Sequence, residues 1–509
     1  MSLQRDGATL SPWQNIPQLT QSTLSDTTKN TYDTIIIGAG ITGITTALLL
    51  QKAGKKCLVL DGGDIGFGTT GGTTAHINTF FDTTYPEIDS KFSKDASKLV
   101  ADAGKLAVEM IGSFVKAYHI DCNFETKVGY LYAETEKEAE QLNDILESSK
   151  NAGIDVERST TNGVPVSFLQ SIKFDGQAQF HPLKYIQGLA KQFIELGGVI
   201  KNHTFVNEVK QEEDQCIAIA GNEVFVASYL LYATHIPPGI NKFSFRCAPY
   251  RSYVLGIRLN DDSQYPENLA YDMQEPYHYF RTHVVNGEKI LILGGADHKT
   301  GHDDPQQAFE DLENYAAQRF IVKDIPYHWS SQYYVPADGL PYIGKMNEAD
   351  DRIFVATGYN GNGMTWGTVA GHLISDLMLG RDNPFTELFD PCRVKPIAGF
   401  TEFVKENADV AYHFVVDRFT SEDMDSFKEI GRGEGKVVEF EGEKLAIYKD
   451  KGGIISALSP VCTHAGCIVS FNAEEKSWDC PCHGGRFDLD GKVLCGPPLS
   501  ALKQVDVGK

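Results

Sequence analysis

Two short segments near the C-terminus constrain the fold more than any other part of this 509-residue chain. The first contains Cys462 and His464 in a C-x-H pattern, and the second contains Cys480 and His483 in a C-x-x-H pattern. Fifteen residues separate His464 from Cys480, so the segments are expected to be separate loops. Thiolate and imidazole side chains both bind transition metals such as iron and zinc. The pattern therefore predicts two loops that reach one metal centre from opposite sides.

This ligand set resembles that of Rieske proteins, in which two Cys hold one iron of a 2Fe-2S cluster and two His hold the other. The resemblance covers about residue 427 to the end of the chain and implies electron transfer. A structural zinc site also combines Cys and His, but its usual C-x2-C and H-x3-5-H spacings fit these segments less well. The predicted cluster ligands are Cys462, His464, Cys480 and His483.

Other residues of the two loops bear on the cluster's surroundings. Cys467 and Cys482 follow the ligands, one in each loop, and are interpreted as a disulfide that ties the loops together. Cys495 is expected to be a structural thiol. In respiratory Rieske proteins a Ser and a Tyr, at the positions of Gly485 and Phe487, donate hydrogen bonds to cluster and ligand sulfur atoms. Because neither residue here has a side-chain donor, we expect a reduction potential in the lower part of the range of about −150 to +300 mV.

A second strong pattern lies near the N-terminus. A β-branched run at residues 34–37 precedes a G-x-G-x-x-G sequence and a helical stretch, and a second apolar run at residues 57–60 ends at Asp61. Glycine lets the backbone approach a pyrophosphate at a helix N-terminus, and an acidic residue at this offset accepts hydrogen bonds from ribose hydroxyls. The complete pattern predicts a dinucleotide-binding unit. Its glycines are Gly38, Gly40 and Gly43.

A later segment indicates which dinucleotide is bound. Residues 352–358 are typical of a buried strand, and a glycine-rich turn at 359–365 and a helix to about residue 379 follow. With the N-terminal pattern, this segment resembles the FAD-dependent oxidoreductases of the D-amino-acid oxidase type, which include glycine oxidase and sarcosine oxidase. The resemblance covers roughly residues 31–392. It implies FAD contacts at Gly38, Gly40, Gly43, Asp61, Thr69, Thr70, Gly358, Gly361, Gly363, Met364 and Thr365.

The same resemblance implies a substrate that lies over the flavin and is held by a side chain of a preceding sheet. Arg281 occupies a matching position before the pair Gly294 and Gly295, and a guanidinium could hold a substrate carboxylate with two hydrogen bonds. His76 resembles the position at which some dimethylglycine-type dehydrogenases attach FAD covalently. Other candidate residues, which a packing role would explain equally well, are Arg251, Tyr253, Tyr277, His235 and His298.

These patterns predict an α/β FAD-binding (Rossmann-like) domain with an interleaved antiparallel-sheet substrate domain, plus a small all-β Rieske domain. Helices are expected around residues 99–114, 136–151, 182–196 and 400–419, and strands at 253–259, 277–282 and 290–293. The expected divisions are an N-terminal arm (1–30), the FAD-dependent oxidoreductase (31–392), a linker helix (393–426) and the Rieske domain (427–509).

Composition narrows the possible partners and location. The length exceeds the size at which single cores stop growing, so two or three domains are expected. A net charge of −22 argues against nucleic acid or an anionic membrane surface as a partner. No apolar stretch approaches a membrane span, and the first 30 residues lack a signal-peptide pattern, so a cytoplasmic location is expected.

The function these observations predict is oxidation of a small-molecule amine or amino acid by FAD, with electrons passing through the chain's own cluster to an external one-electron acceptor. Three alternatives remain. An NAD(P)H-dependent flavin and iron-sulfur reductase would need a second nicotinamide-binding pattern, which is not found. A Rieske oxygenase would need a mononuclear iron site, for which no candidate is found. A redox-sensing electron-transfer protein would use both cofactors without turnover.

Overall fold

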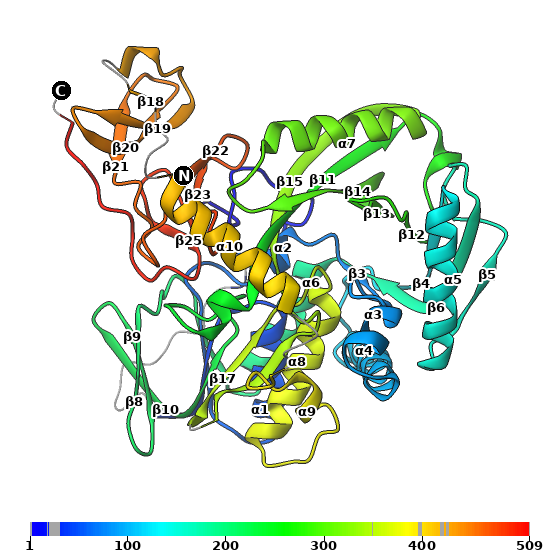
Figure 1. Ribbon diagram of the computed structural model, residues 1–509. Helices are drawn as coiled ribbons and strands as arrows, with labels where there is room; N and C mark the ends of the chain where they lie inside the picture. Colours follow the sequence, from blue (N-terminus) through cyan, green and yellow to red (C-terminus); the bar gives the residue numbers. More distant parts are fainter. Residues whose placement is uncertain are drawn as a thin grey trace.

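The computed structural model describes residues 3–17, 19, 31–348, 350–394, 400–417, 422–423 and 427–507. Figure 1 shows a large unit (residues 31–394), a helix that crosses its surface, and a C-terminal unit (residues 427–507) built from strands and loops. The expected linker helix appears as α10 (Phe400–Val416), and the rest of its expected range to residue 419 includes positions outside the described residues. No helix of the described part is long and apolar enough to cross a membrane.

The first sheet of the large unit carries the dinucleotide-binding pattern. Strand β1 pairs in parallel with β2 and β10, which gives the order β16-β17-β10-β1-β2-β7. All four residues of β2 are buried, as expected for a parallel strand covered on both faces. The strands are β1 (Thr31–Ile37), β2 (Cys57–Leu60), β7 (Val199–Lys201), β8 (Glu208–Gln211), β9 (Cys216–Ala220), β10 (Glu223–Tyr232), β16 (Tyr342–Asn347) and β17 (Asp350–Thr357).

Helices pack against this sheet and against each other. Helix α1 (Ile41–Lys52) contacts both α8 (Gly363–Met378) and α6 (Pro182–Glu195). Residues of α1 are buried around its circumference, because α6 and α8 cover it from two sides. The predicted helix at 182–196 is confirmed as α6, and the helix after the glycine-rich turn is confirmed as α8.

The second sheet is mainly antiparallel and has the order β15-β11-β14-β13-β12-β4-β6-β3, with β5 beside β6. The three strands expected here overlap β11, β13 and β14. The strands are β3 (His76–Ile77), β4 (Glu125–Ala133), β5 (Val156–Ser159), β6 (Gln170–Gln179), β11 (Cys247–Leu259), β12 (Leu269–Tyr271), β13 (Tyr279–Val285), β14 (Glu288–Lys299) and β15 (Val322–Pro336). The helices around it are α3 (Tyr85–Lys91), α4 (Lys94–Ala117), α5 (Glu136–Asn151) and α7 (Pro305–Arg319).

The C-terminal unit consists of two small sheets. One has the order β18-β19-β20-β21 and the other the order β22-β23-β24-β25, which agrees with the expected small all-β domain. Its strands are β18 (Glu422–Asp423), β19 (Glu434–Phe440), β20 (Glu443–Lys449), β21 (Ile455–Leu458), β22 (Ser470–Asn472), β23 (Ser477–Asp479), β24 (Arg486–Phe487) and β25 (Val493–Cys495). The remaining short helices are α2 (Thr69–Gly72), α9 (Thr386–Phe389), η1 (Lys242–Phe245), η2 (Asp262–Gln264) and η3 (Phe427–Glu429).

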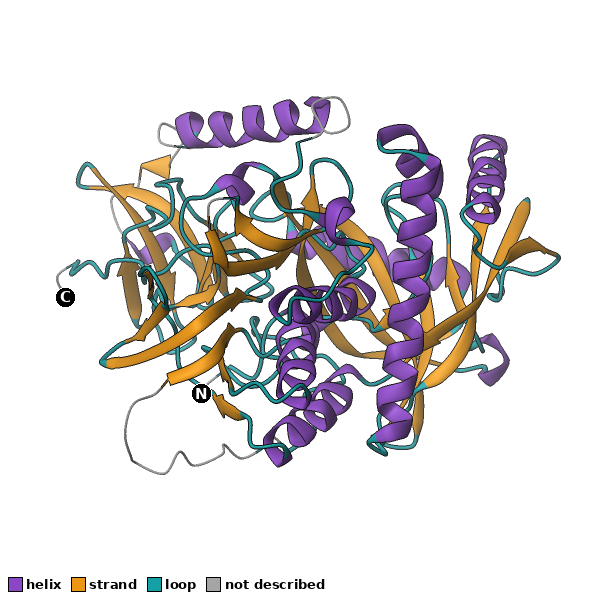
Figure 2. Ribbon diagram, turned by 90° about the horizontal axis from the view of Figure 1, so that it is seen from below, coloured by secondary structure: helices purple, strands orange, loops and turns teal. Residues whose placement is uncertain are grey.

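The units are packed side by side rather than joined only by a linker. Figure 2 shows α10 lying along one side of the molecule, and the amide of Asn407 on this helix donates a hydrogen bond to the carbonyl of Phe245. An N-terminal arm (residues 3–17) contacts both units: Asp6 N–H donates to the Phe67 carbonyl, and Ala8 N–H donates to the Glu475 carbonyl. The arm therefore contributes to the junction of the two units.

Candidate functional site

The predicted metal ligands lie on two loops of the C-terminal unit that have the same construction. The N–H of Gly466 donates to the carbonyl of Cys462 at 3.0 Å, and the N–H of Gly484 donates to the carbonyl of Cys480 at 3.1 Å. Both glycines have positive φ angles, 84° and 72°, which non-glycine residues adopt at a cost. Each loop therefore closes tightly on its own cysteine.

The structure brings the two predicted histidine ligands together. The rings of His464 and His483 lie 4.8 Å apart, centroid to centroid. Burial lowers the pKa of both imidazoles, that of His483 to about 4, so both rings are neutral near pH 7. Among the residues that the structure describes, no hydrogen-bond partner is found for the buried ring nitrogens of either histidine, which is rare for buried polar atoms. Two such imidazoles, on the same two loops as the neighbouring thiols of Cys462 and Cys480, fit a 2Fe-2S cluster.

The disulfide predicted from the loop cysteines is confirmed. Cys467 and Cys482 are bonded, with 2.03 Å between their sulfur atoms. The bond joins the first ligand loop to the second, and the Cys482 sulfur lies 3.9 Å from the carbonyl oxygen of Val410 on α10. Cys495 is a free thiol whose pKa burial raises to about 12, which agrees with a structural role.

A cavity of about 1220 Å³ is lined by both sheets of the large unit and by the C-terminal unit. Gly38 and Gly40 line it, and Gly38 has a φ of 108°. A Cβ on Gly38 would lie 2.4 Å from the carbonyl oxygen of Ala233. Gly43 lies outside the cavity lining, but a Cβ there would lie 1.9 Å from the Gly38 carbonyl oxygen. The first two glycines thus leave room for a ligand, and the third allows close packing.

Asp61 follows β2 and faces the same cavity. Its carboxylate accepts hydrogen bonds from the N–H groups of Ala39, at 2.6 Å, and Gly63, at 2.8 Å. Burial raises the pKa of this carboxyl, and the two N–H groups oppose that rise. The backbone therefore fixes Asp61 at the position where a dinucleotide ribose is expected. Its contact with the ribose stays a prediction.

The remaining predicted FAD contacts divide into residues that reach the cavity and residues that do not. Gly358, with a φ of 76°, and Thr365, whose hydroxyl donates to the Asn78 carbonyl, are outside the lining. The N-terminal end of α8 lines the cavity through Gly363 and Met364, so the positive end of the helix dipole faces it. The residues in the lining are Thr69, Thr70, Gly361, Gly363 and Met364.

Comparison with known families gives the two cofactors. A family model described as "FAD dependent oxidoreductase" matches residues 33–377. The chain belongs to this FAD-dependent oxidoreductase family. A second model, described as "Rieske [2Fe-2S] domain", matches residues 423–506. This oxidoreductase therefore binds FAD in its large unit and a 2Fe-2S cluster in its C-terminal unit. We call the cavity lined by Gly38 and Gly40 the flavin cavity.

One relative matches nearly the whole chain, and two others match about seven tenths of it. YhfW of Bacillus subtilis (strain 168), named as a Rieske 2Fe-2S iron-sulfur protein, is 34% identical over 478 residues, which are 93% of each chain. Gamma-glutamylputrescine oxidoreductase of Escherichia coli (strain K12) is 24% identical and covers 69% of this chain and 84% of its own. The glycine oxidase structure from Geobacillus kaustophilus superposes with a TM-score of 0.61 at 17% identity, covering 72% of this oxidoreductase and 100% of that chain.

The structure places Arg281 of this oxidoreductase outside the lining of the flavin cavity. Its guanidinium is fully buried and donates to the carbonyls of Thr74 and Ala75, at 2.8 Å each, and of Phe180, at 3.2 Å. The ring of Trp13, on the N-terminal arm, lies 5.6 Å from it. The predicted contact with a substrate carboxylate gains no support from this geometry, because backbone groups already bind the cation.

Two buried acids that are not among the predicted site residues face the cavity instead. Asp297, on β14, accepts hydrogen bonds from the hydroxyls of Ser252, at 2.5 Å, and Tyr333, at 2.8 Å. Burial raises the pKa of Asp297 to about 6. Burial, and then the charge of Asp297, raise the pKa of Asp82 to about 7. A sequence signal existed for Asp297, since it follows the predicted glycine pair by two residues.

Three of the other candidate residues line the cavity, and three do not. His235 and Tyr277 line it, as does His76, whose ring nitrogen lies 3.0 Å from the Thr74 hydroxyl oxygen. Burial, followed by Arg281, lowers the pKa of His76 to about 3. Its covalent link to FAD stays a prediction. Outside the lining are Arg251, in an ion-pair network, and Tyr253 and His298, in contact with each other.

The cavity and the predicted cluster site share a wall on β15. Tyr334 lines the cavity, and its hydroxyl donates to the carbonyl of the cluster ligand His483 at 3.1 Å. Gln332 also lines the cavity and donates to the carbonyl of Gly484 at 3.0 Å. The ring of His235 meets that of Tyr334 edge-on at 4.7 Å. The flavin cavity is thus separated from the cluster loop by single side chains.

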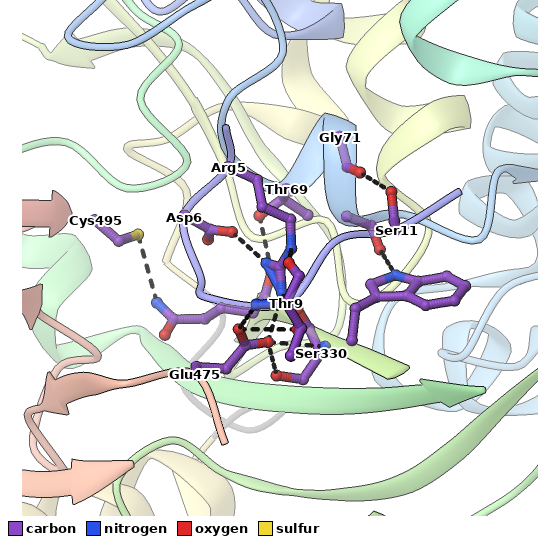
Figure 3. Close-up of polar contacts among 12 residues, drawn as sticks. Arg5, Asp6, Thr9, Ser11, Thr69, Gly71, Ser330, Glu475 and Cys495 are labelled. Carbon is purple, nitrogen blue, oxygen red and sulfur yellow. Dashed lines mark hydrogen bonds and ion pairs between the residues drawn. The ribbon is translucent and has the colours of Figure 1, made fainter. Parts of the chain in front are cut away.

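A buried ionic network holds the C-terminal unit against the large unit. Figure 3 shows Arg5 of the N-terminal arm beside Glu475 of the C-terminal unit, with 2.5 Å between nitrogen and oxygen. Arg5 also donates to the carbonyl of Ser330 on β15, and Arg486 donates to the carbonyl of Asp6 at 2.6 Å. Arm, large unit and C-terminal unit therefore meet in one buried network.

Proposed function

We propose that this oxidoreductase oxidises a C–N single bond of a small amine or amino acid to C=N, taking a hydride from the C–H bond next to nitrogen and releasing a proton from the nitrogen. The two electrons then pass singly to its own cluster, which delivers them to an external one-electron acceptor. FAD, when bound, takes up the electron pair, and the 2Fe-2S cluster carries one electron at a time. The chain's own residues position the substrate, keep water out and hold the cluster loop against the flavin cavity.

The observation that carries the proposal is the shared wall formed by Tyr334 and Gln332. Each side chain has one end in the cavity lining and a hydrogen bond to a carbonyl of the second ligand loop. Residues 493–496 of the C-terminal unit line the same cavity. Electrons could therefore pass from the flavin to the cluster without a large movement of the C-terminal unit. Relatives that contain only a flavin unit, such as the glycine oxidases, lack this neighbour, since this chain extends beyond them.

A His464→Ala variant tests the internal relay, because it removes a cluster ligand far from the glycine fingerprint. Anaerobic mixing with a reducing substrate should bleach the flavin of this variant at the wild-type rate. Reoxidation by a one-electron dye should slow at least tenfold, because the cluster pathway is lost. Electron paramagnetic resonance of the wild-type protein should show the reduced cluster within the same turnover.

The outcomes separate this proposal from the alternatives. Loss of both half-reactions in a His464→Ala variant that still binds FAD would contradict a relay inside the chain. Reduction of the flavin by NAD(P)H, with no reduction by any amine or amino acid, would identify a reductase. A Tyr412→Phe variant, altered at an exposed residue of α10, is the control for general effects on the C-terminal unit.

A further inference from the structure

One face of the second sheet forms a polar wall of the flavin cavity. Five adjacent strands, in the order β15-β11-β14-β13-β12, each place a side chain on this wall. A Cβ on Gly294 would lie 2.1 Å from the ring of Tyr279, so this glycine lets the tyrosine lie across the neighbouring strand. The wall residues are Tyr333, Ser252, Asp297, Tyr279 and Tyr271.

Asp82 faces the same space from the loop after β3. Its carboxylate lies against the glycine-rich turn, since a Cβ on Gly361 would lie 2.3 Å from the Asp82 Oδ2 atom. Its hydrogen-bond partners are Tyr277 and Asn362, which are neutral. Asp297 likewise accepts only from hydroxyl groups. We call Asp82, Asp297 and the neighbouring tyrosines the acidic wall.

The acidic wall lacks a cation of its own. Neither carboxylate forms an ion pair with any residue that the structure describes. No arginine in the described ranges lines the cavity, and the one lysine there, Lys492, belongs to the C-terminal unit. A buried carboxylate is normally paired with a positive group, and two of them close together raise the cost of ionisation. A cationic ligand would therefore supply the positive charge that the carboxylates of Asp82 and Asp297 lack.

We propose that the substrate is a cationic amine that carries no carboxylate beside its reacting carbon, and that the acidic wall recognises its ammonium group. This inference rests on the proposed function and narrows it from amines and amino acids to amines. The tyrosine rings add cation–π attraction for an ammonium or alkylammonium ion. A substrate carboxylate would instead face Asp82 and Asp297, while Arg281, the guanidinium expected to bind it, is sequestered by backbone carbonyls.

Two inert ions of similar shape test recognition without turnover. Tert-butylammonium and the zwitterion 2-aminoisobutyrate differ by a methyl and a carboxylate, and neither has hydrogen on the carbon next to nitrogen, so neither can be oxidised there. Their affinities for the oxidised holoprotein are measured by calorimetry and by the shift of the bound flavin spectrum. Tert-butylammonium should bind at least about tenfold more tightly, because the carboxylate of 2-aminoisobutyrate would face the like charges of Asp82 and Asp297.

Substitutions of Asp297 and Asp82 test whether the acidic wall causes the preference for tert-butylammonium. Asp297→Asn keeps the shape of the side chain, and should weaken tert-butylammonium binding by roughly tenfold. Binding of 2-aminoisobutyrate should change much less, because its ammonium group loses the same attraction while its carboxylate is freed from repulsion. The fold should tolerate this variant, because burial already favours the neutral form of this carboxyl. Asp82→Asn provides a second, independent test. The matched control is Asp155→Asn, since Asp155 is an exposed acid outside the cavity lining.

Reduction of the flavin by phenethylamine and by each enantiomer of phenylalanine completes the test. Only the amine should bleach the flavin. Bleaching by phenylalanine alone would overturn the inference and leave the proposed function intact. A retained preference for tert-butylammonium, with no bleaching by any amine or amino acid, would instead contradict the proposed function. Equal binding of the two inert ions would show that the acidic wall does not select the ammonium group. Normal binding of tert-butylammonium by Asp297→Asn would lead to the same conclusion.

Discussion

At the residue scale, Gly485 and Phe487 set the surroundings of the predicted cluster. A Cβ on Gly485 would lie 2.6 Å from the ring of Pro498 and 3.6 Å from the Cys462 sulfur. Glycine is therefore required here by the neighbouring proline, and a serine donor could be added only if Pro498 moved. Phe487 is fully buried in the same apolar cluster as Cys462 and Cys480, and we predict that a hydroxyl added to its ring reaches a ligand sulfur.

Phe487→Tyr is the simpler way to add a donor and should raise the reduction potential of the cluster. A hydrogen bond that favours the reduced form by about 1 kcal/mol corresponds to about 40 mV for a one-electron couple. Protein-film electrochemistry measures the change. Phe471→Tyr, on the partly exposed strand β22, is the control and should leave the potential unchanged. If the potential of Phe487→Tyr is unchanged or lower, a missing hydrogen bond does not explain the low reduction potential predicted for the wild-type cluster.

Arg281 shows what residue-level patterns can and cannot predict. Strand alternation correctly places it on the same face as Tyr279, two residues earlier, which does line the cavity. The loop at residues 73–76 and Trp13 of the N-terminal arm cover that face at Arg281, and they come from distant parts of the sequence. Local spacing predicts the direction of a side chain, but long-range packing decides what it meets.

At the element scale, α10 is held on the large unit by charge. Lys299, at the end of β14, forms ion pairs with Glu406 at 2.6 Å and with Asp409, and only 10% of its side chain is exposed. His302 also contacts Asp409, at 3.6 Å. The helix in turn contacts the disulfide of the ligand loops. These ion pairs therefore link the substrate-domain sheet to the back of the cluster loops.

Lys299→Gln should loosen α10 without unfolding the large unit. Removing a largely buried cation from two carboxylates should cost about 2 kcal/mol, which corresponds to roughly thirtyfold faster hydrogen exchange of the α10 amides. Mass spectrometry of exchanged peptides measures this rate. Lys405→Gln, at an exposed position of the same helix, should have no effect. Faster exchange over the whole large unit would indicate global destabilisation rather than a local contact.

Element types were more predictable than element boundaries. The capping box at Thr135 and Glu138 explains why α5 begins at Glu136, as predicted. By contrast, the predicted strand at 253–259 is the end of β11, which begins at Cys247, because pairing with β15 extends it through residues without strong alternation. The acidic wall was missed because it combines a loop and several strands, and no single segment carries its pattern.

At the scale of the whole molecule, the ionic network of the N-terminal arm fixes the two cofactor units relative to each other. Glu475 is fully buried and accepts hydrogen bonds from Arg5 and from the hydroxyl and N–H of Ser330. Arg251 lies 3.4 Å from the same carboxylate. Removing one member of a buried ion network leaves its partners charged and unpaired, which commonly costs about 3–5 kcal/mol.

Glu475→Gln should therefore destabilise the junction by about 3 kcal/mol, because two guanidinium groups lose their shared anion. The expected result is a lower midpoint of thermal unfolding and slower transfer of electrons from flavin to cluster, with flavin reduction by substrate retained. Glu474→Gln changes the adjacent, partly exposed residue and is the control. Normal transfer in a Glu475→Gln protein with a lowered unfolding midpoint would show that the relay does not depend on this network.

The same carboxylate predicts how the junction responds to acid. Burial alone would raise the pKa of Glu475, but Arg5, Arg251 and Arg486 together lower it from 4.5 to about 2. A carboxyl with a depressed pKa in the folded protein stabilises the fold above its unfolded pKa and loses that contribution as pH falls. About 3 kcal/mol should therefore be lost between about pH 4.5 and 2, measured by denaturant unfolding of the holoprotein. Because a glutamine side chain cannot titrate, Glu475→Gln should flatten this part of the pH profile, and an unaltered profile in that variant would assign the acid sensitivity to other groups.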